Sequence, residues 1–139
     1  MLYCGRANAN KMNTESPYRI LIVDDIFVNR LLIKEMVKKI GATCFEAQNG
    51  KEAIAILLKE TIDIVLMDIE MPVMNGLETT KYIRESAPIS KRNVPIIALT
   101  AHNPATFFND FTDAGFDQLM TKPYSVDKVL NLIHEVCKK

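Results

Sequence analysis

Residues 62–76 have the sequence IDIVLMDIEMPVMNG, in which an apolar run ends at Asp68 and a loop with a proline and a glycine follows. An apolar run of this length predicts a strand that is buried on both faces of a parallel sheet. A second run, ILIV at residues 20–23, ends in the same way at Asp24 and Asp25. Because parallel strands end at the same edge of a sheet, we expect these three acids to share one pocket.

Short apolar runs alternate with helical patterns along the rest of the chain. We expect strands at about residues 19–24, 42–47, 62–68, 94–99 and 116–120. We expect helices at about residues 28–40, from the Asn49-Gly50 turn onward, at 76–85 with Asn75 as a possible cap, at 104–114, and from Ser125 onward. The inward faces are predicted to carry Val28, Leu31, Leu32, Met36 and Ile40 in the first helix, Ala53, Ile54, Leu57 and Leu58 in the second, and Val126, Val129, Leu130, Ile133 and Cys137 in the last.

This alternation predicts an α/β fold, a doubly wound parallel sheet of five strands with helices on both faces. Ligand sites in such sheets lie beyond the carboxyl ends of the strands. Thr100, which ends the fourth strand, and Lys122, which follows the fifth, fall at that edge together with the three acids. We therefore expect one domain over residues 18–139, preceded by a flexible tail at 1–17.

Composition narrows the classes of function. The chain has 139 residues and a formal net charge of zero, without a basic block, so we expect no direct binding of nucleic acid. The apolar runs are too short to cross a membrane and the amino-terminal stretch lacks the apolar core of a signal peptide, so we expect a cytoplasmic protein. The cysteines at 4, 44 and 137 are expected to be reduced thiols, and His102 and His134 surface groups.

Three carboxylates in a partly desolvated pocket repel one another unless cations compensate. Lys122 supplies one charge, and an oxygen-rich donor set suits a hard ion such as Mg²⁺. A metal, a lysine and a hydroxyl are a set suited to phosphoryl transfer, in which Asp68 can act as the nucleophile. Each residue taken alone has an ordinary structural explanation, such as helix capping by Asp24 and Asp25. Their joint placement carries the hypothesis.

The residues also resemble the receiver domain of two-component response regulators over about residues 18–137. The markers are the acidic pair in VDD at 23–25, the stretch MDIEMPVMNG at 67–76, ALTA at 98–101, and Lys122-Pro123. The resemblance implies the strand order 2-1-3-4-5, with helices 1 and 5 on one face and helices 2, 3 and 4 on the other. It also implies a cis Lys122-Pro123 peptide.

The same resemblance implies the roles of the site residues. Asp68 would accept a phosphoryl group from a phosphohistidine on a partner protein, in a reaction that depends on Mg²⁺. Asp25, Asp68 and the backbone carbonyl of Glu70 would ligate the metal, Asp24 would help through water, and Thr100 and Lys122 would hold the phosphoryl oxygens. Glu70 and His102 occupy positions that influence how long the phosphoryl group survives.

The resemblance is greatest to receivers of hybrid histidine kinases and phosphorelays. It implies a sensor histidine kinase or a histidine-containing phosphotransfer protein as partner, with dimerisation through the fourth helix, fifth strand and fifth helix as a further option. Signals would pass by conformational change or onward phosphotransfer. The family usually has an aromatic side chain where this chain has Leu119, so an aromatic switch is not carried over. The phenylalanines at 107, 108 and 111 are expected to be core residues rather than a partner surface.

Three other functions remain as alternatives. A phosphatase of the haloacid-dehalogenase type would have a second Asp where Glu70 stands. A flavodoxin-like electron carrier would need a phosphate-binding loop after the first strand, where this chain has the acids 24 and 25. A receiver fold that serves only as a protein-binding scaffold would lack phosphorylation. On the leading hypothesis the chain is not an enzyme that turns over a free substrate, although it catalyses its own phosphorylation and dephosphorylation.

Overall fold

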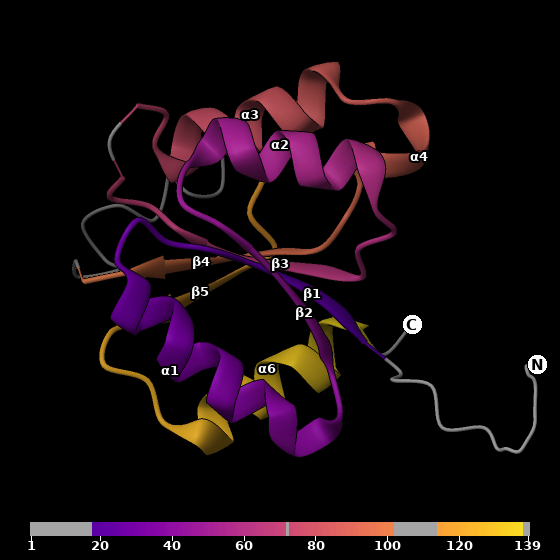
Figure 1. Ribbon diagram of the computed structural model, residues 1–139. Coiled ribbons are helices and arrows are strands. Elements are labelled where there is room, and N and C mark those ends of the chain that lie inside the picture. Colours follow the sequence, from indigo (N-terminus) through magenta and orange to yellow (C-terminus); the bar gives the residue numbers. More distant parts are fainter. Residues whose placement is uncertain (1–17, 72, 102–113, 138–139) are drawn as a thin grey trace, which may run out of the picture.

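The computed structural model describes residues 18–71, 73–101 and 114–137. Five parallel strands form one sheet in the order β2-β1-β3-β4-β5, as predicted (Figure 1). The strands are β1 (Arg19–Val23), β2 (Thr43–Ala47), β3 (Ile64–Asp68), β4 (Ile96–Thr100) and β5 (Gln118–Thr121). The last three strands begin two residues later than predicted. β4 and β5 also end one residue later, so Thr100 and Thr121 belong to the sheet.

Helices cover both faces of the sheet (Figure 1). On one face lie α1 (Phe27–Val37) and α6 (Val126–Cys137), which contact each other, with the 3-10 turn η1 (Lys38–Ile40) after α1. On the other lie α2 (Gly50–Lys59) and α3 (Gly76–Ser86), followed by the short α4 (Ile89–Arg92), which the sequence did not predict. Among the described residues, no helix is long and apolar enough to cross a bilayer.

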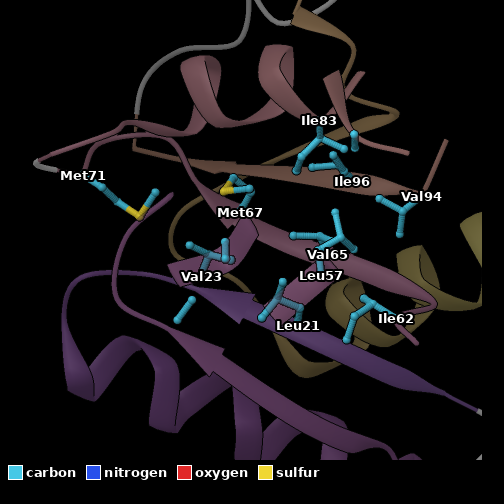
Figure 2. Close-up of a cluster of buried hydrophobic side chains, with 13 residues drawn as sticks. Leu21, Val23, Leu57, Ile62, Val65, Met67, Met71, Ile83, Val94 and Ile96 are labelled. Carbon is cyan, nitrogen blue, oxygen red and sulfur yellow. The ribbon is translucent and has the colours of Figure 1, made fainter. Parts of the chain in front are cut away.

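The core consists of one apolar layer on each face of the sheet. Side chains that alternate along β1 enter different layers. Leu21 and Val23 pack toward α2 and α3 (Figure 2). Ile20 and Ile22 pack toward α1 and α6. Every residue of β3 and β4 is buried. Their uninterrupted apolar sequences follow from this burial on both faces.

Asparagine caps start the two helices that follow β2 and β3. The Asn49 side chain accepts a hydrogen bond from the amide of Glu52 at the start of α2, over 2.9 Å. At α3, Asn75 and Glu78 form a reciprocal capping box, with each side chain accepting from the other residue's amide. The predicted cap at Asn75 is therefore confirmed, and it fixes the end of the loop that follows Asp68.

The predicted inward face of the first helix was partly wrong: Met36 and Ile40 pack against the core, but the first turns of α1 do not follow the prediction. Val28 and Leu32 are more than half exposed, and the helix buries Arg30, Ile33 and Val37 instead. Apolar side chains lie on several sides of this helix, so hydrophobic spacing alone did not determine which side faces the sheet. In α2 the prediction failed only at Leu58, which is 47% exposed while Leu57 is buried.

Several predictions concern residues outside the described part of the chain: the tail at 1–17, the helix at 104–114 with its three phenylalanines, Cys4 and His102. The described cysteines, Cys44 and Cys137, are free thiols that pack partly buried against the core. His134 is exposed, as expected, and lies 2.7 Å from the Tyr18 hydroxyl.

Neighbouring leucines in α2 provide a test of this packing. Leu57→Ala removes a side chain that is 1% exposed in the core, and we expect the free energy of unfolding to fall by about 2–5 kcal/mol. Leu58→Ala removes the half-exposed neighbour and should cost less than about 1 kcal/mol. Urea denaturation followed by circular dichroism measures both values. Equal losses would contradict the orientation of α2.

Candidate functional site

The acids at the carboxyl edge of the sheet are brought together by strand register. Val23 of β1 lies opposite Met67 of β3, so Asp24 and Asp68 occupy equivalent positions at the next step along neighbouring strands. Asp24, Asp25 and Asp68 each direct a carboxylate oxygen into one group, with these atoms within 4.8 Å of one another. The predicted acidic pocket is therefore present.

The amide groups of the chain hold two of these carboxylates. Asp24 accepts a hydrogen bond at Oδ1 from the amide of Ile26 over 2.9 Å, while its buried Oδ2 has no hydrogen-bond partner among the described residues. Asp68 accepts at Oδ1 from the amide of Glu70 over 3.3 Å. Asp24 is fully buried and Asp68 is 2% exposed, so water screens the charges poorly.

Lys122 lies where the sequence predicted, one residue beyond β5. Its amide donates to the carbonyl of Thr100 over 2.7 Å, which ties the residue to the end of β4. The Nζ atom lies 3.3 Å from Asp68 Oδ1 and 3.9 Å from Asp24 Oδ2. The Lys122-Pro123 peptide is cis, as expected. One ammonium thus faces two buried carboxylates.

Burial and neighbouring charge raise the pKa of Asp68 to about 6. Desolvation is the largest cause and repulsion by Asp24 the second, while Lys122 and the amide of Glu70 lower the pKa by smaller amounts. The lysine therefore compensates only part of the negative charge. The pocket favours a further cation.

The fifth predicted residue, Thr100, ends β4 with its side chain buried. Its hydroxyl is 3.2 Å from the Glu70 carboxylate oxygen Oε2 and donates a hydrogen bond to it. Since Glu70 also donates its amide to Asp68, this residue connects the hydroxyl to the acidic group. All five predicted side chains therefore lie around one edge of the sheet.

Sequence reasoning missed Tyr124 and Arg30 at this site. Burial raises the pKa of the Tyr124 hydroxyl, and the charges of Asp24, Asp68 and Glu70 raise it further, so this side chain lies beside the acids. Arg30 donates to the backbone carbonyl of Asp24 over 2.8 Å. Neither residue ends a strand, and the pattern of polar residues at strand ends was the signal that found the others.

Leu119, in β5, packs with Ile69 and Ala98 in a small apolar cluster that also includes Phe116 and Leu77. Register places it directly opposite Ala98 in β4, two residues before Thr100. An aliphatic side chain thus occupies the position at which an aromatic switch would be expected.

The donor set fits a hard divalent ion. Three carboxylates offer oxygen ligands at one point, one buried oxygen of Asp24 has no hydrogen-bond partner within the described chain, and the raised pKa of Asp68 signals incomplete compensation. Mg²⁺ prefers such oxygen ligands and uses few protein carboxylates. The described histidine and cysteines lie elsewhere and add no softer ligands to this group.

Comparison with known proteins agrees with the fold and identifies the family. The family described as "Response regulator receiver domain" matches residues 20–134. The two-component response regulator 24 of Arabidopsis thaliana is 32% identical over 123 residues, which cover 88% of this chain and 86% of that protein. Sporulation initiation phosphotransferase F of Bacillus subtilis is 31% identical over 115 residues, which cover 83% and 90%. The chain belongs to the response regulator receiver domain family.

Solved structures show the same fold. The receiver domain of the sensor histidine kinase PA1611 from Pseudomonas aeruginosa, which has magnesium in its active-site cleft, superposes with a TM-score of 0.80 at 29% identity and covers 88% of this chain and 98% of that one. The complex of Saccharomyces cerevisiae Ypd1, a histidine phosphotransfer protein, with the receiver domain of Ssk1 matches with a TM-score of 0.80 at 27% identity, covering 91% and 92%. Other relatives are much longer: the match covers 13% of the sensor protein GacS of Pseudomonas syringae.

The raised pKa of Asp68 predicts a pH-dependent cost to folding. Between an ordinary value of 3.8 and about 6, the folded protein holds a proton that the unfolded chain releases, so stability falls as pH rises through this window. With chelator present, Asp68→Asn should raise the free energy of unfolding by on the order of 2 kcal/mol at about pH 7.5, and the gain should shrink toward zero near pH 4. Urea denaturation across this range measures it. A gain that is independent of pH would contradict the assignment.

Proposed function

We propose that the chain is a phospho-acceptor receiver domain in which Asp68 takes a phosphoryl group from a phosphohistidine on a partner protein. The observation that carries this proposal is the position of Asp68, whose buried carboxylate lies 3.3 Å from Lys122 Nζ and within one cluster with Asp24 and Asp25. A nucleophilic carboxylate needs a cation beside it to accept a negatively charged phosphoryl group.

In the proposed reaction, an oxygen of Asp68 forms a bond to phosphorus while the bond between phosphorus and the donor imidazole nitrogen breaks. The electron pair of that bond returns to the imidazole. Lys122 offsets charge on the phosphoryl oxygens, and the Thr100 hydroxyl turns from Glu70 to donate to one of them. Hydrolysis of the acyl phosphate would restore the carboxylate.

Mg²⁺ is the proposed cofactor. Asp24, Asp25 and Asp68 would hold it, with the backbone carbonyl of Glu70, whose amide already contacts Asp68. When bound, the ion would neutralise the crowded carboxylates and phosphoryl oxygens. Strand register and Lys122 hold the Asp68 carboxylate at this edge of the sheet, so the Thr100 hydroxyl is the group that must turn for the reaction.

Phosphorylation by a small donor tests the proposal. Incubation with acetyl phosphate and Mg²⁺ should add one phosphoryl group, detected by intact-protein mass spectrometry. The addition should disappear with chelator and in Asp68→Asn. Asp63→Asn, one residue before the same strand begins, is the matched control and should be phosphorylated like the unaltered chain.

Two outcomes would replace the proposal. If acetyl phosphate and phosphorylated Ypd1 both leave the mass unchanged, the chain is better described as a binding scaffold. Continuous release of phosphate from many monoesters would favour a phosphatase. On our proposal the chain turns over no free substrate and acts in the cytoplasm, by conformational change or onward phosphotransfer.

An exposed apolar surface supports a protein as the phosphoryl donor. Five large apolar side chains are 39–61% exposed around the start of α1: Ile26, Phe27, Val28, Leu31 and Leu32. The surface begins directly after Asp25, so it continues from the rim of the acidic pocket. A donor must bring its phosphohistidine to Asp68 and would cover this surface in doing so. We propose that a histidine kinase or phosphotransfer protein docks there.

Substitutions at this surface separate docking from chemistry. Leu32→Ser should slow phosphotransfer from phosphorylated Ypd1 by about tenfold, the equivalent of one lost apolar contact, and leave phosphorylation by acetyl phosphate unchanged. Ile89→Ser alters an even more exposed apolar side chain, on α4, and serves as control. Equal slowing with both donors, or in both variants, would exclude docking at α1.

Dimerisation through the fourth helix, fifth strand and fifth helix stays a prediction. The fourth helix in this prediction is the one expected at residues 104–114, not α4, and nearly all of those residues lie outside the described ranges.

A further inference from the structure

Arg30 is a buried cation at the back of the acidic pocket. Arg30 is 8% exposed, although its apolar neighbours Val28, Leu31 and Leu32 on α1 face solvent. Nε donates to the Glu46 carboxylate in β2 over 2.9 Å, and Nη1 donates to the backbone carbonyl of Asp24 over 2.8 Å. One guanidinium therefore joins α1, β2 and the turn that carries two of the acids.

The peptide groups of Asp24 are held from two directions. Its amide donates to the carbonyl of Ala47 in β2 over 3.1 Å, and its carbonyl accepts from Arg30. The Asp24 side chain then accepts from the amide of Ile26. With these groups engaged, the backbone between Asp24 and Asp25 has a single orientation, and both carboxylates leave it toward Asp68.

Glu46 keeps the guanidinium in place. This carboxylate also accepts from Lys34 Nζ over 2.8 Å, and hydrogen bonding to Lys34, together with that to Arg30, lowers the pKa of Glu46. Glu46 therefore stays ionised near neutral pH and balances the buried charge of Arg30. Because Nε binds Glu46, Nη1 remains available to donate to the Asp24 carbonyl. Donating to two acceptors in this way needs the planar guanidinium of arginine.

We propose that Arg30 is a positioning residue for the metal-binding acids, acting through the Asp24 carbonyl. This inference rests on the proposed function, because it assumes that Asp24, Asp25 and Asp68 hold Mg²⁺. Arg30 donates to Glu46 and to the Asp24 carbonyl, so on this proposal it would act without touching the metal or the phosphoryl group. It fixes the turn from which two of the three carboxylates project, so its loss weakens metal binding more than it alters the chemistry at Asp68.

The test compares two arginine-to-lysine variants. Arg84 is the control: its guanidinium donates to the carbonyls of Arg92, Val94 and Gly115 and pairs with Asp117. These contacts lie before β4 and β5 begin, at the opposite edge of the sheet from the acids. Loss of Arg84 should therefore disturb the fold without disturbing the pocket.

Calorimetric titration with Mg²⁺ gives the primary measurement. Arg30→Lys should weaken Mg²⁺ binding by about tenfold, while Arg84→Lys stays within about twofold of the unaltered chain. Phosphorylation by acetyl phosphate should follow the same pattern: Arg30→Lys needs more Mg²⁺ for half the maximal rate, and its maximal rate at saturating Mg²⁺ stays within about twofold. Thermal melting in chelator reports the structural cost of each variant.

The outcomes distinguish the inference from the function on which it rests. Suppose first that the unaltered chain binds Mg²⁺ and is phosphorylated. If both variants then bind Mg²⁺ equally well, or if their Mg²⁺ affinity falls in proportion to their loss of stability, Arg30 has no positioning role. If the unaltered chain neither binds Mg²⁺ nor accepts a phosphoryl group, the proposed function itself fails. Should Arg30→Lys not fold, Glu46→Gln replaces it, and unchanged Mg²⁺ affinity in that variant overturns the proposal.

Discussion

The parallel register between β1 and β3 is the constraint on which the pocket depends. Val23 lies opposite Met67, and the residues that follow them, Asp24 and Asp68, leave the sheet side by side. A slip of one residue would move each apolar side chain to the opposite face of the sheet and separate the acids. The buried layers on both faces therefore hold the register, and the register holds the site.

This arrangement places like charges where water screens them poorly. Lys122 faces Asp68 and Asp24 but leaves the pKa of Asp68 raised to about 6, so the folded chain carries an electrostatic cost at neutral pH. Because the negative charge is only partly compensated, binding of a cation at this edge is favourable, and the cation could in turn hold a phosphoryl group. The Glu70 carboxylate, which accepts a hydrogen bond from the Thr100 hydroxyl, adds a further negative group at this edge. The site is built from interactions that the core must stabilise.

The sequence predicted the sheet and the principal site residues because both depend on local patterns. Buried parallel strands need continuous apolar runs, and polar residues at their ends stand out against them. The orientation of α1 was not predictable in this way, because apolar side chains lie on several of its sides. Arg30 and Tyr124 escaped notice for a related reason. Their proximity to the acids arises from tertiary packing, which spacing along the chain does not encode.

The inward face of α1 was in part wrongly predicted for a structural reason, and the same reason links the acidic pocket to the exposed apolar surface of α1. Burying Arg30 against Asp24 and Glu46 fixes the rotation of the helix, and that rotation leaves Val28 and Leu32 in solvent. The centroid of the exposed Phe27 ring lies 5.6 Å from the Arg30 guanidinium carbon, so the apolar surface borders the arginine. A partner seated on that surface would cover Phe27, which lies against the buried Arg30. On our proposals, the docking surface and the residue that positions the acids are therefore adjacent in the fold.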